Sequence, residues 1–142
     1  MNVKYKLESI VETEFRMDYD FDYPSMDYEK ARVLVGHEIK PNMDKDLVVI
    51  TARASIVYGE EERTLASNSI MMTFGLSPIK EIITLNEDGT FVTRSNLVVE
   101  TFLVAAIGGL RGVMMKNLKG TPLDTYFIPL IPIEQLRIKQ TD

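Results

Sequence analysis

Residues 3–23 alternate between uncharged and charged side chains. From position 3 to position 23 no odd position carries a charge, whereas every even position does except Ile10. A period of two is typical of a β-strand with one face on a core and the other in water. A strand of this length would span about 70 Å, more than a small domain needs. We therefore expect it to bend or break near Ile10.

Three further alternating segments follow, at residues 31–40, 47–58 and 67–76. A polar turn, PNMDKD, separates the first of these segments from the second, and another, GEEER, separates the second from the third. Short polar connections between alternating segments favour antiparallel pairing. Pro78 closes the last of these strands, and NEDGT predicts a turn in the connector that follows. The sequence therefore predicts a four-stranded antiparallel sheet.

The period then changes to that of an α-helix. Residues 97–118 contain no proline, Asn96 is a favourable N-cap, and Gly120 is a favourable stop. Before the last turn only Glu100 and Arg111 carry charge. At 100° per residue these two share one face, so most of the helix circumference requires burial.

A membrane span is the obvious alternative for such a helix. The uncharged run between Glu100 and Arg111 is ten residues long, which is too short to cross a bilayer. The expected sheet can cover only one side of the helix, so we expect a second subunit to cover another side. Adjacent glycines would let a neighbouring helix approach closely. We assign the oligomer interface to Val104, Gly108, Gly109 and Met115.

Composition and charge restrict the class of protein. The chain has 142 residues, 45% hydrophobic and 26% charged, which is typical of one soluble domain over residues 1–142. Cysteine is absent, so disulfides and thiolate chemistry are excluded. The first 20 residues contain no apolar signal-peptide core, and we expect a cytoplasmic protein. A net charge of −5 disfavours nucleic acid as a partner.

The segment DYDFDYPSMDY, residues 18–28, admits three interpretations. Its acids and Glu29 have the spacing of an EF-hand calcium loop, but Tyr23 stands where that loop requires glycine. The acids fit better as the solvated face of a strand end. The aromatic side chains either pack in the core or line an apolar groove, and the sequence leaves both open. They are Tyr19, Phe21, Tyr23 and Tyr28.

Candidate catalytic residues are few. The single histidine, His37, lies on the apolar face of the second strand and has no triad or metal partner in the sequence. A structural histidine is the commoner case. The chain contains no phosphate-binding loop, nucleophile elbow or His/Cys metal spacing. We therefore predict a protein that is not an enzyme and binds no cofactor or metal. The eight methionines include two adjacent pairs, residues 71–72 and 114–115, which suit gap filling or an adaptable binding surface.

The C-terminal region GTPLDTYFIPLIPIEQL, residues 120–136, predicts an extended apolar run and a short helix that starts near Pro132. This region, together with NLVVETFLVAAIGGLRG at residues 96–112 and the order of elements, resembles the SecB family of export chaperones. In that family Arg-Gly runs directly into Thr-Phe-Pro, whereas here seven residues separate the Arg-Gly from the Gly-Thr. The chain thus resembles a divergent member. The matching positions are Gly120, Thr121, Pro129, Pro132 and Leu136.

The resemblance implies an α+β fold, with a four-stranded antiparallel sheet packed by the long helix. It implies a homo-oligomer, a dimer or a tetramer, that holds unfolded or export-bound polypeptides without ATP in an apolar groove between sheet and helix. A translocase motor is then a further partner. The alternative is a structural or adaptor oligomer that keeps the fold without client binding. The candidate client-binding residues are Tyr19, Phe21, Tyr23, Tyr28, Met72 and Phe74.

Overall fold

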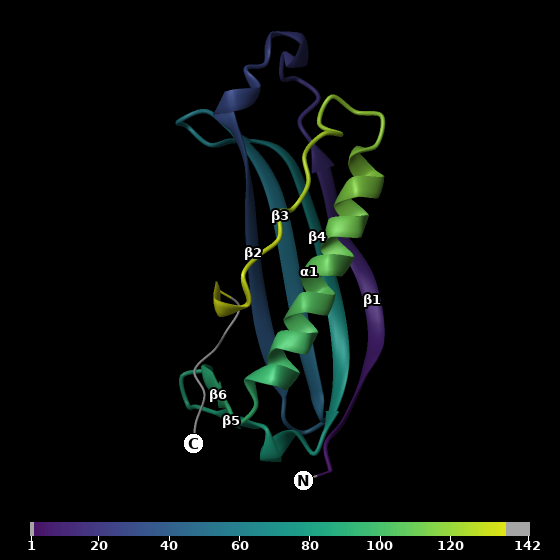
Figure 1. Cartoon of the computed structure of the whole chain (residues 1–142), viewed down its shortest axis with the longest axis vertical. Helices are drawn as coiled ribbons and strands as arrows, with labels where there is room; N and C mark the ends of the chain where they lie inside the picture. The colour runs from purple at the N-terminus through teal and green to yellow at the C-terminus, as the bar shows by residue number, and fades with distance from the viewer. Residues whose placement is uncertain (1, 136–142) are drawn as a thin grey trace.

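The computed structural model describes residues 2–135, which form one four-stranded sheet, one long helix and a small hairpin (Figure 1). The sheet is antiparallel with the strand order β1-β4-β3-β2, and α1 lies along one of its faces. The fold class is therefore α+β, as the sequence predicts. The elements are β1 (Lys4–Met17), β2 (Ala31–Asn42), β3 (Leu47–Tyr58), β4 (Arg63–Ser77), β5 (Ile83–Leu85), β6 (Phe91–Thr93) and α1 (Asn96–Leu118).

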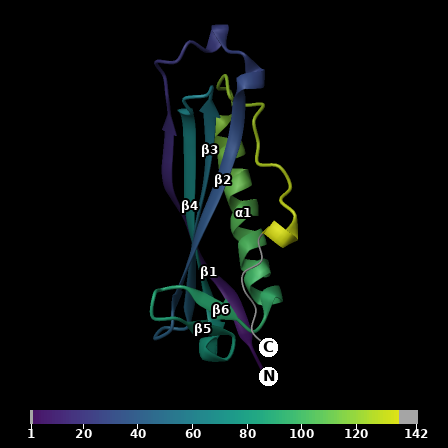
Figure 2. The same cartoon turned by 90° about the vertical axis from the view of Figure 1, so that its left-hand side faces the viewer.

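The core lies between α1 and the two central strands, β3 and β4. Phe102 of α1 stacks on Phe74 of β4 with ring centroids 4.3 Å apart. Leu110 and Met114 of α1 are fully buried against the same face of the sheet. Figure 2 shows α1 on one side of the sheet only, so no helix covers the opposite side of the sheet within the described residues.

Strand β1 is an edge strand that bends at two irregularities. Its register with β4 shifts after Leu7 and again after Glu12. Side-chain direction has a period of two, so each extra residue exchanges the two faces of the strand. Ile10 therefore lies opposite Met72, on the helix side. Where the sequence predicts a bend or break near Ile10, the structure has these two register shifts within one continuous strand, and they explain why this even position is apolar.

The first strand ends earlier than its alternation predicts, at Met17 rather than Tyr23. Asp18 accepts a hydrogen bond of 3.0 Å from the backbone N–H of Asp20, a local turn that competes with strand pairing. Pro24 then lies in a short 3₁₀ turn, Tyr23–Ser25. Residues 18–30 consequently form a crossover segment between β1 and β2, where the alternation of acids and aromatics continues without a strand.

The ends of α1 follow the expected signals with one correction. The N-cap is Ser95, whose Oγ accepts a hydrogen bond of 3.4 Å from the backbone N–H of Val98, and Asn96 is the first helical residue. Serine and asparagine cap almost equally well, so the sequence did not distinguish them. Gly120 has φ = +80°, the left-handed conformation expected of a helix stop.

The connector between β4 and α1 contains a hairpin that the alternation did not predict. Strands β5 and β6 pair antiparallel around the expected turn at residues 86–90. Each has three residues, too few to show a period. Beyond α1 the chain makes turns over residues 119–125 and then runs without helix or strand to Pro132, where a 3₁₀ turn, Ile133–Gln135, follows. The matching position Leu136 lies outside the described residues.

Candidate functional site

An aromatic cluster anchors the crossover segment to the end of the sheet. The ring of Phe21 packs edge-on against Tyr23 and Tyr58, with centroids 5.0 and 4.9 Å away. The guanidinium carbon of Arg63 lies 5.1 Å from the centroid of the Phe21 ring. Both Phe21 and Tyr23 are half-buried, so much of each ring serves the packing of the crossover segment itself.

An ion pair between Asp18 and Arg63 lies beside this cluster. Arg63 Nε donates a hydrogen bond of 2.8 Å to Asp18 Oδ2, and this contact lowers the pKa of Asp18 below its ordinary value of 3.8. Partial burial raises the pKa of Tyr23, whose hydroxyl donates to the Asp18 backbone carbonyl. Within residues 2–135 no group of three or more His, Cys, Asp or Glu side chains has the geometry to hold a metal ion.

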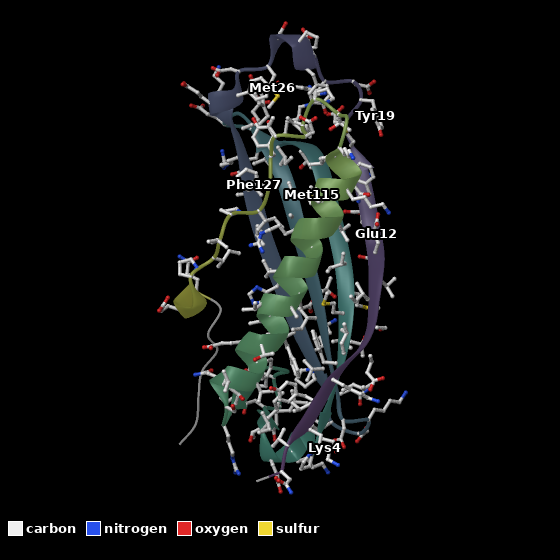
Figure 3. All side chains as sticks on the ribbon, turned by 45° about the vertical axis from the view of Figure 1, so that its right-hand side comes forward. Lys4, Glu12, Tyr19, Met26, Met115 and Phe127 are labelled. Atoms are coloured by element: carbon white, nitrogen blue, oxygen red, sulfur yellow. The ribbon has the colours of Figure 1, made fainter. Side chains whose placement is uncertain are left out.

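Two of the candidate client-binding residues are open to solvent. Tyr19 is 78% exposed, and Figure 3 shows it at the end of the molecule opposite Lys4. Tyr28 is 54% exposed, and its ring stacks on Tyr126 of the C-terminal segment with centroids 6.2 Å apart. The crossover segment and the C-terminal segment therefore meet at one aromatic contact.

Met72 and Phe74 differ from the expectation. Both point toward α1 and are buried in the core beneath it. Both lie on one face of β4, as their alternation predicts, but α1 already covers this part of that face. In this conformation neither side chain offers surface to a polypeptide.

The outward face of α1 carries no charged residue before its last turn. Val104, Gly108 and Met115 are exposed there, as are Leu97, Thr101, Ala105 and Gly112. Gly109 instead faces the sheet, because a Cβ at this position would lie 2.4 Å from Met72 Cε. The helix is long and apolar enough to be a membrane span, but half of its most apolar stretch is buried against the sheet, as in a core helix.

The helix side of β1 lies beside α1 and is apolar except for Glu12. Tyr5 contacts Phe102 of α1 edge-on with centroids 5.7 Å apart, and Figures 1 and 3 show β1 running beside the helix. The register with β4 turns four exposed apolar side chains of β1 to the helix side. We name this combined region the β1–α1 surface. Its β1 members are Tyr5, Leu7, Ile10 and Phe15.

The C-terminal segment, residues 121–135, lies on the other flank of α1 and runs back across the helix side of the sheet (Figure 1). Arg111 Nε donates a hydrogen bond of 2.8 Å to the carbonyl of Ile128, and Arg111 Nη2 one of 2.9 Å to that of Pro129. The single arginine in an otherwise uncharged stretch of helix was the signal for this contact, which the sequence did not assign.

His37 does not form an acid–base pair with the carboxylates near it in the sheet. A shallow, open hollow is lined by Glu14, Glu38 and Arg53 as well as His37. The register pairs His37 with the buried Ala52, so its ring lies on the helix side, whereas Glu38 points to the opposite side. Desolvation lowers the pKa of His37 below its ordinary value of 6.5.

No family model and no curated protein matches the chain. Two solved structures are similar to the chain at a distance. One is the SecB-like chaperone of Mycobacterium tuberculosis in complex with a ChAD peptide from the HigA1 antitoxin, at 9% identity and a TM-score of 0.49 over 90% of each chain. The other is a protein of unknown function from Streptococcus agalactiae, at 12% identity and a TM-score of 0.41 over 93% of this chain and 100% of that one. Both similarities are too distant to assign a function, so we derive one from the surfaces of this chain.

Proposed function

We propose that this protein is a non-enzymatic, ATP-independent chaperone that holds unfolded polypeptides and works as an oligomer. The observation that supports this is the amount of apolar surface exposed on the helix side of the sheet. Monomeric soluble proteins rarely expose contiguous apolar patches of more than a few hundred Å². Within residues 2–135, the large apolar side chains exposed on β1 and α1 of this side are Tyr5, Leu7, Ile10, Phe15, Leu97, Val104 and Met115.

The β1–α1 surface is the part that we assign to self-association. Gly108 and Gly112 lie four residues apart, and a Cβ at either would meet no atom within 4 Å. Glycine in a helix costs about 1 kcal/mol relative to alanine, and nothing in the protomer offsets that cost here. A second helix packed closely across these positions would offset it. A second copy of the chain is the simplest partner for such a face.

The crossover segment is the part that we assign to clients. An unfolded polypeptide has no fixed sequence, so its binder needs apolar, adaptable contacts and few obligatory hydrogen bonds. Tyr19 and Tyr28 supply such contacts, and Phe127 of the C-terminal segment is 66% exposed on the same side. The acids of the segment favour basic clients and keep the complex soluble. These acids are Asp18, Asp20, Asp22 and Asp27.

The test is suppression of aggregation. An unfolded protein is diluted from denaturant with and without this protein, in the absence of ATP, and light scattering is followed. We expect the wild type to suppress scattering and the double variant Tyr19→Ser/Tyr28→Ser to lose most of that effect. The matched control is Leu34→Ser, which changes an exposed apolar residue on the sheet face away from α1. A wild type without effect at equimolar concentration would remove the chaperone proposal.

One observation favours a second candidate, a structural or adaptor oligomer without client binding. The groove beside α1 already holds residues of the C-terminal segment, with Leu123 and Ile128 fully buried. If this segment never leaves, and the β1–α1 surface is consumed by subunit contacts, little apolar surface remains for a client. This candidate predicts an oligomer in light scattering whose mass does not change when an unfolded protein is added.

We further propose a cytoplasmic location, export-bound clients and a translocase motor as partner. The support is the resemblance of residues 96–136 to the SecB family. Deleting the protein should then slow secretion of a subset of exported proteins, measured by pulse-chase labelling. Normal secretion in the deletion strain, with aggregation suppression intact in vitro, would leave a chaperone whose clients are not export-bound.

A further inference from the structure

The C-terminal segment has the properties of a bound peptide. Residues 125–133, TYFIPLIPI, carry no charge and two prolines. Among the side chains described between residues 124 and 135, that of Ile128 is fully buried at 1% exposure, and Tyr126 and Ile131 pack partly against the core. Their neighbours Phe127 and Leu130 point outward, Leu130 with 90% exposure. Anchors therefore alternate with exposed residues, as in an extended peptide lying in a groove.

The groove exists because α1 leaves one edge of the sheet open. The helix packs on β3 and β4, while the apolar helix-side residues of β2 are only partly buried and His37 on the same side is exposed. These apolar residues belong to the same apolar cluster as Tyr126 and Ile131. Figures 1 and 2 show the segment on this side of the sheet, next to α1. The partly buried residues of β2 in this cluster are Ala31, Val33, Val35 and Ile39.

Arg111 holds the main chain of the segment, not its side chains. Its guanidinium donates to two successive carbonyls, those of Ile128 and Pro129. Within the described residues 127–132, no backbone N–H donates a hydrogen bond to a backbone carbonyl. Recognition through carbonyls requires no N–H from the peptide, so proline is tolerated at any position in it. Such recognition is independent of the sequence of side chains.

We propose that residues 125–135 form a displaceable strap, which occupies a peptide-binding groove between α1 and β2 in the resting protein. Arg111 is the residue that holds the main-chain carbonyls of whichever extended apolar polypeptide lies there. This inference rests on the proposed function and deepens it. It makes the client class extended, uncharged, apolar segments that can contain proline, like the strap itself.

The strap competes with clients through its covalent attachment. A tethered occupant acts at an effective concentration in the millimolar range, so a free peptide of similar affinity enters the groove rarely. Weakening the anchor of the strap without changing the groove should therefore increase the affinity for a free peptide. Ile128 is that anchor, and Leu130 is a matched control in the same segment.

The experiment uses the full chain and a fluorescent synthetic peptide with the sequence of residues 121–135. We expect the Ile128→Asp protein to bind this peptide at least about tenfold more tightly than the wild type by fluorescence anisotropy. Leu130→Asp should bind as the wild type does, and a peptide carrying the Ile128→Asp change should not bind. Adding Arg111→Met to Ile128→Asp should reduce the affinity again, because the groove then lacks its carbonyl donor.

A second measurement applies if Ile128→Asp fails to fold by circular dichroism. The chain has no cysteine, so a Tyr28→Cys/Tyr126→Cys variant can be joined selectively by a short bifunctional cross-linker. We expect the cross-linked strap to exclude the peptide that the unlinked variant binds. Equal binding before and after cross-linking would overturn the proposal.

The outcomes separate this inference from the proposed function. Tighter peptide binding by Ile128→Asp without any suppression of aggregation would keep the groove and remove the chaperone. Suppression of aggregation that Ile128→Asp leaves unchanged, with equal peptide binding by both proteins, would keep the chaperone and overturn the strap. Loss of the oligomer in Ile128→Asp but not in Leu130→Asp would also overturn it, because the segment would then join subunits.

Discussion

Asn117, in the last turn of α1, donates a hydrogen bond of 2.9 Å from its Nδ2 to Oδ1 of Asn68 in β4. The same Nδ2 lies 3.2 Å from Oε1 of Glu12 in β1. Asn68 is fully buried on a face of β4 that is otherwise apolar, and the described residues offer its own Nδ2 no partner. This polar contact therefore fixes one position of the helix relative to two strands.

Removing Asn117 should destabilise the protein. Asn117→Ala removes the donor to the buried Oδ1 of Asn68, and an unsatisfied buried polar group costs about 1–3 kcal/mol. The free energy of unfolding in urea, followed by circular dichroism, measures this loss. Lys116→Ala is the control, because Lys116 is exposed in the same turn. Equal stability of the two variants would show that the Asn68–Asn117 contact does not hold the helix.

Gly108 and Gly109 are adjacent but should respond differently to alanine. A Cβ at Gly108 meets open space, so Gly108→Ala should raise the stability of the protomer by about 1 kcal/mol through helix propensity. A Cβ at Gly109 would approach Met72 Cε to 2.4 Å and Ile70 Cδ1 to 3.3 Å, so Gly109→Ala should lose that gain or destabilise the fold. Urea unfolding at concentrations where the protein is dissociated compares the two variants.

A larger side chain at Gly108 should also weaken self-association, an effect opposite to the gain in protomer stability. If the β1–α1 surface is a helix–helix interface, Gly108→Leu should weaken association while the protomer remains folded. Sedimentation equilibrium over a range of concentrations measures this. Leu34→Ser on the opposite face of the sheet is the control. An unchanged association constant in Gly108→Leu would move the interface away from this part of α1.

His37 should titrate below its ordinary pKa of 6.5, because desolvation disfavours the charged imidazole. A folded-state pKa below the unfolded value means that the unfolded state binds the proton more tightly. The stability associated with neutral His37 is therefore present above pH 6.5 and falls as the pH decreases below it. The chain has a single histidine, so its ring signals in NMR need no assignment. A midpoint at or above 6.5 would indicate a carboxylate partner that the structure does not show.

Much of the fold could be predicted from the period with which apolar and polar residues alternate along the sequence. Strand β3 has the predicted bounds, and the first register shift of β1 lies next to the single uncharged even position, Ile10. One methionine pair serves both of the uses that the sequence suggests, since Met114 fills the core and Met115 is exposed. The end of β1 could not be predicted in this way. Alternation alone does not distinguish a strand from a turn in which Asp18 accepts a backbone hydrogen bond.

The candidate site was harder to predict, because it depends on what covers each surface. Met72 and Phe74 have the alternation of a groove wall, yet α1 buries both. The role of Arg111 depends on a contact with residues 17 and 18 positions further along the chain. Helical periodicity places Arg111 on a flank of α1, but it contains no information about which distant segment meets that flank.

The Asp18–Arg63 pair should make the crossover segment sensitive to acid. The hydrogen bond from Arg63 lowers the pKa of Asp18 below 3.8, so the pair stabilises the fold above that pH and is lost as the pH falls through the folded-state pKa. Both side chains meet solvent, which screens the pair and keeps its effect on stability small.

Arg63→Gln should return the carboxyl titration of Asp18, followed by ¹³C NMR, toward 3.8. It should also increase hydrogen exchange in residues 18–23, where Arg63 covers the Phe21 ring. Arg32→Gln, which breaks the separate ion pair with Glu62, should leave both measurements unchanged. An Asp18 titration that is the same in the wild type and in Arg63→Gln would mean that Arg63 does not hold the segment.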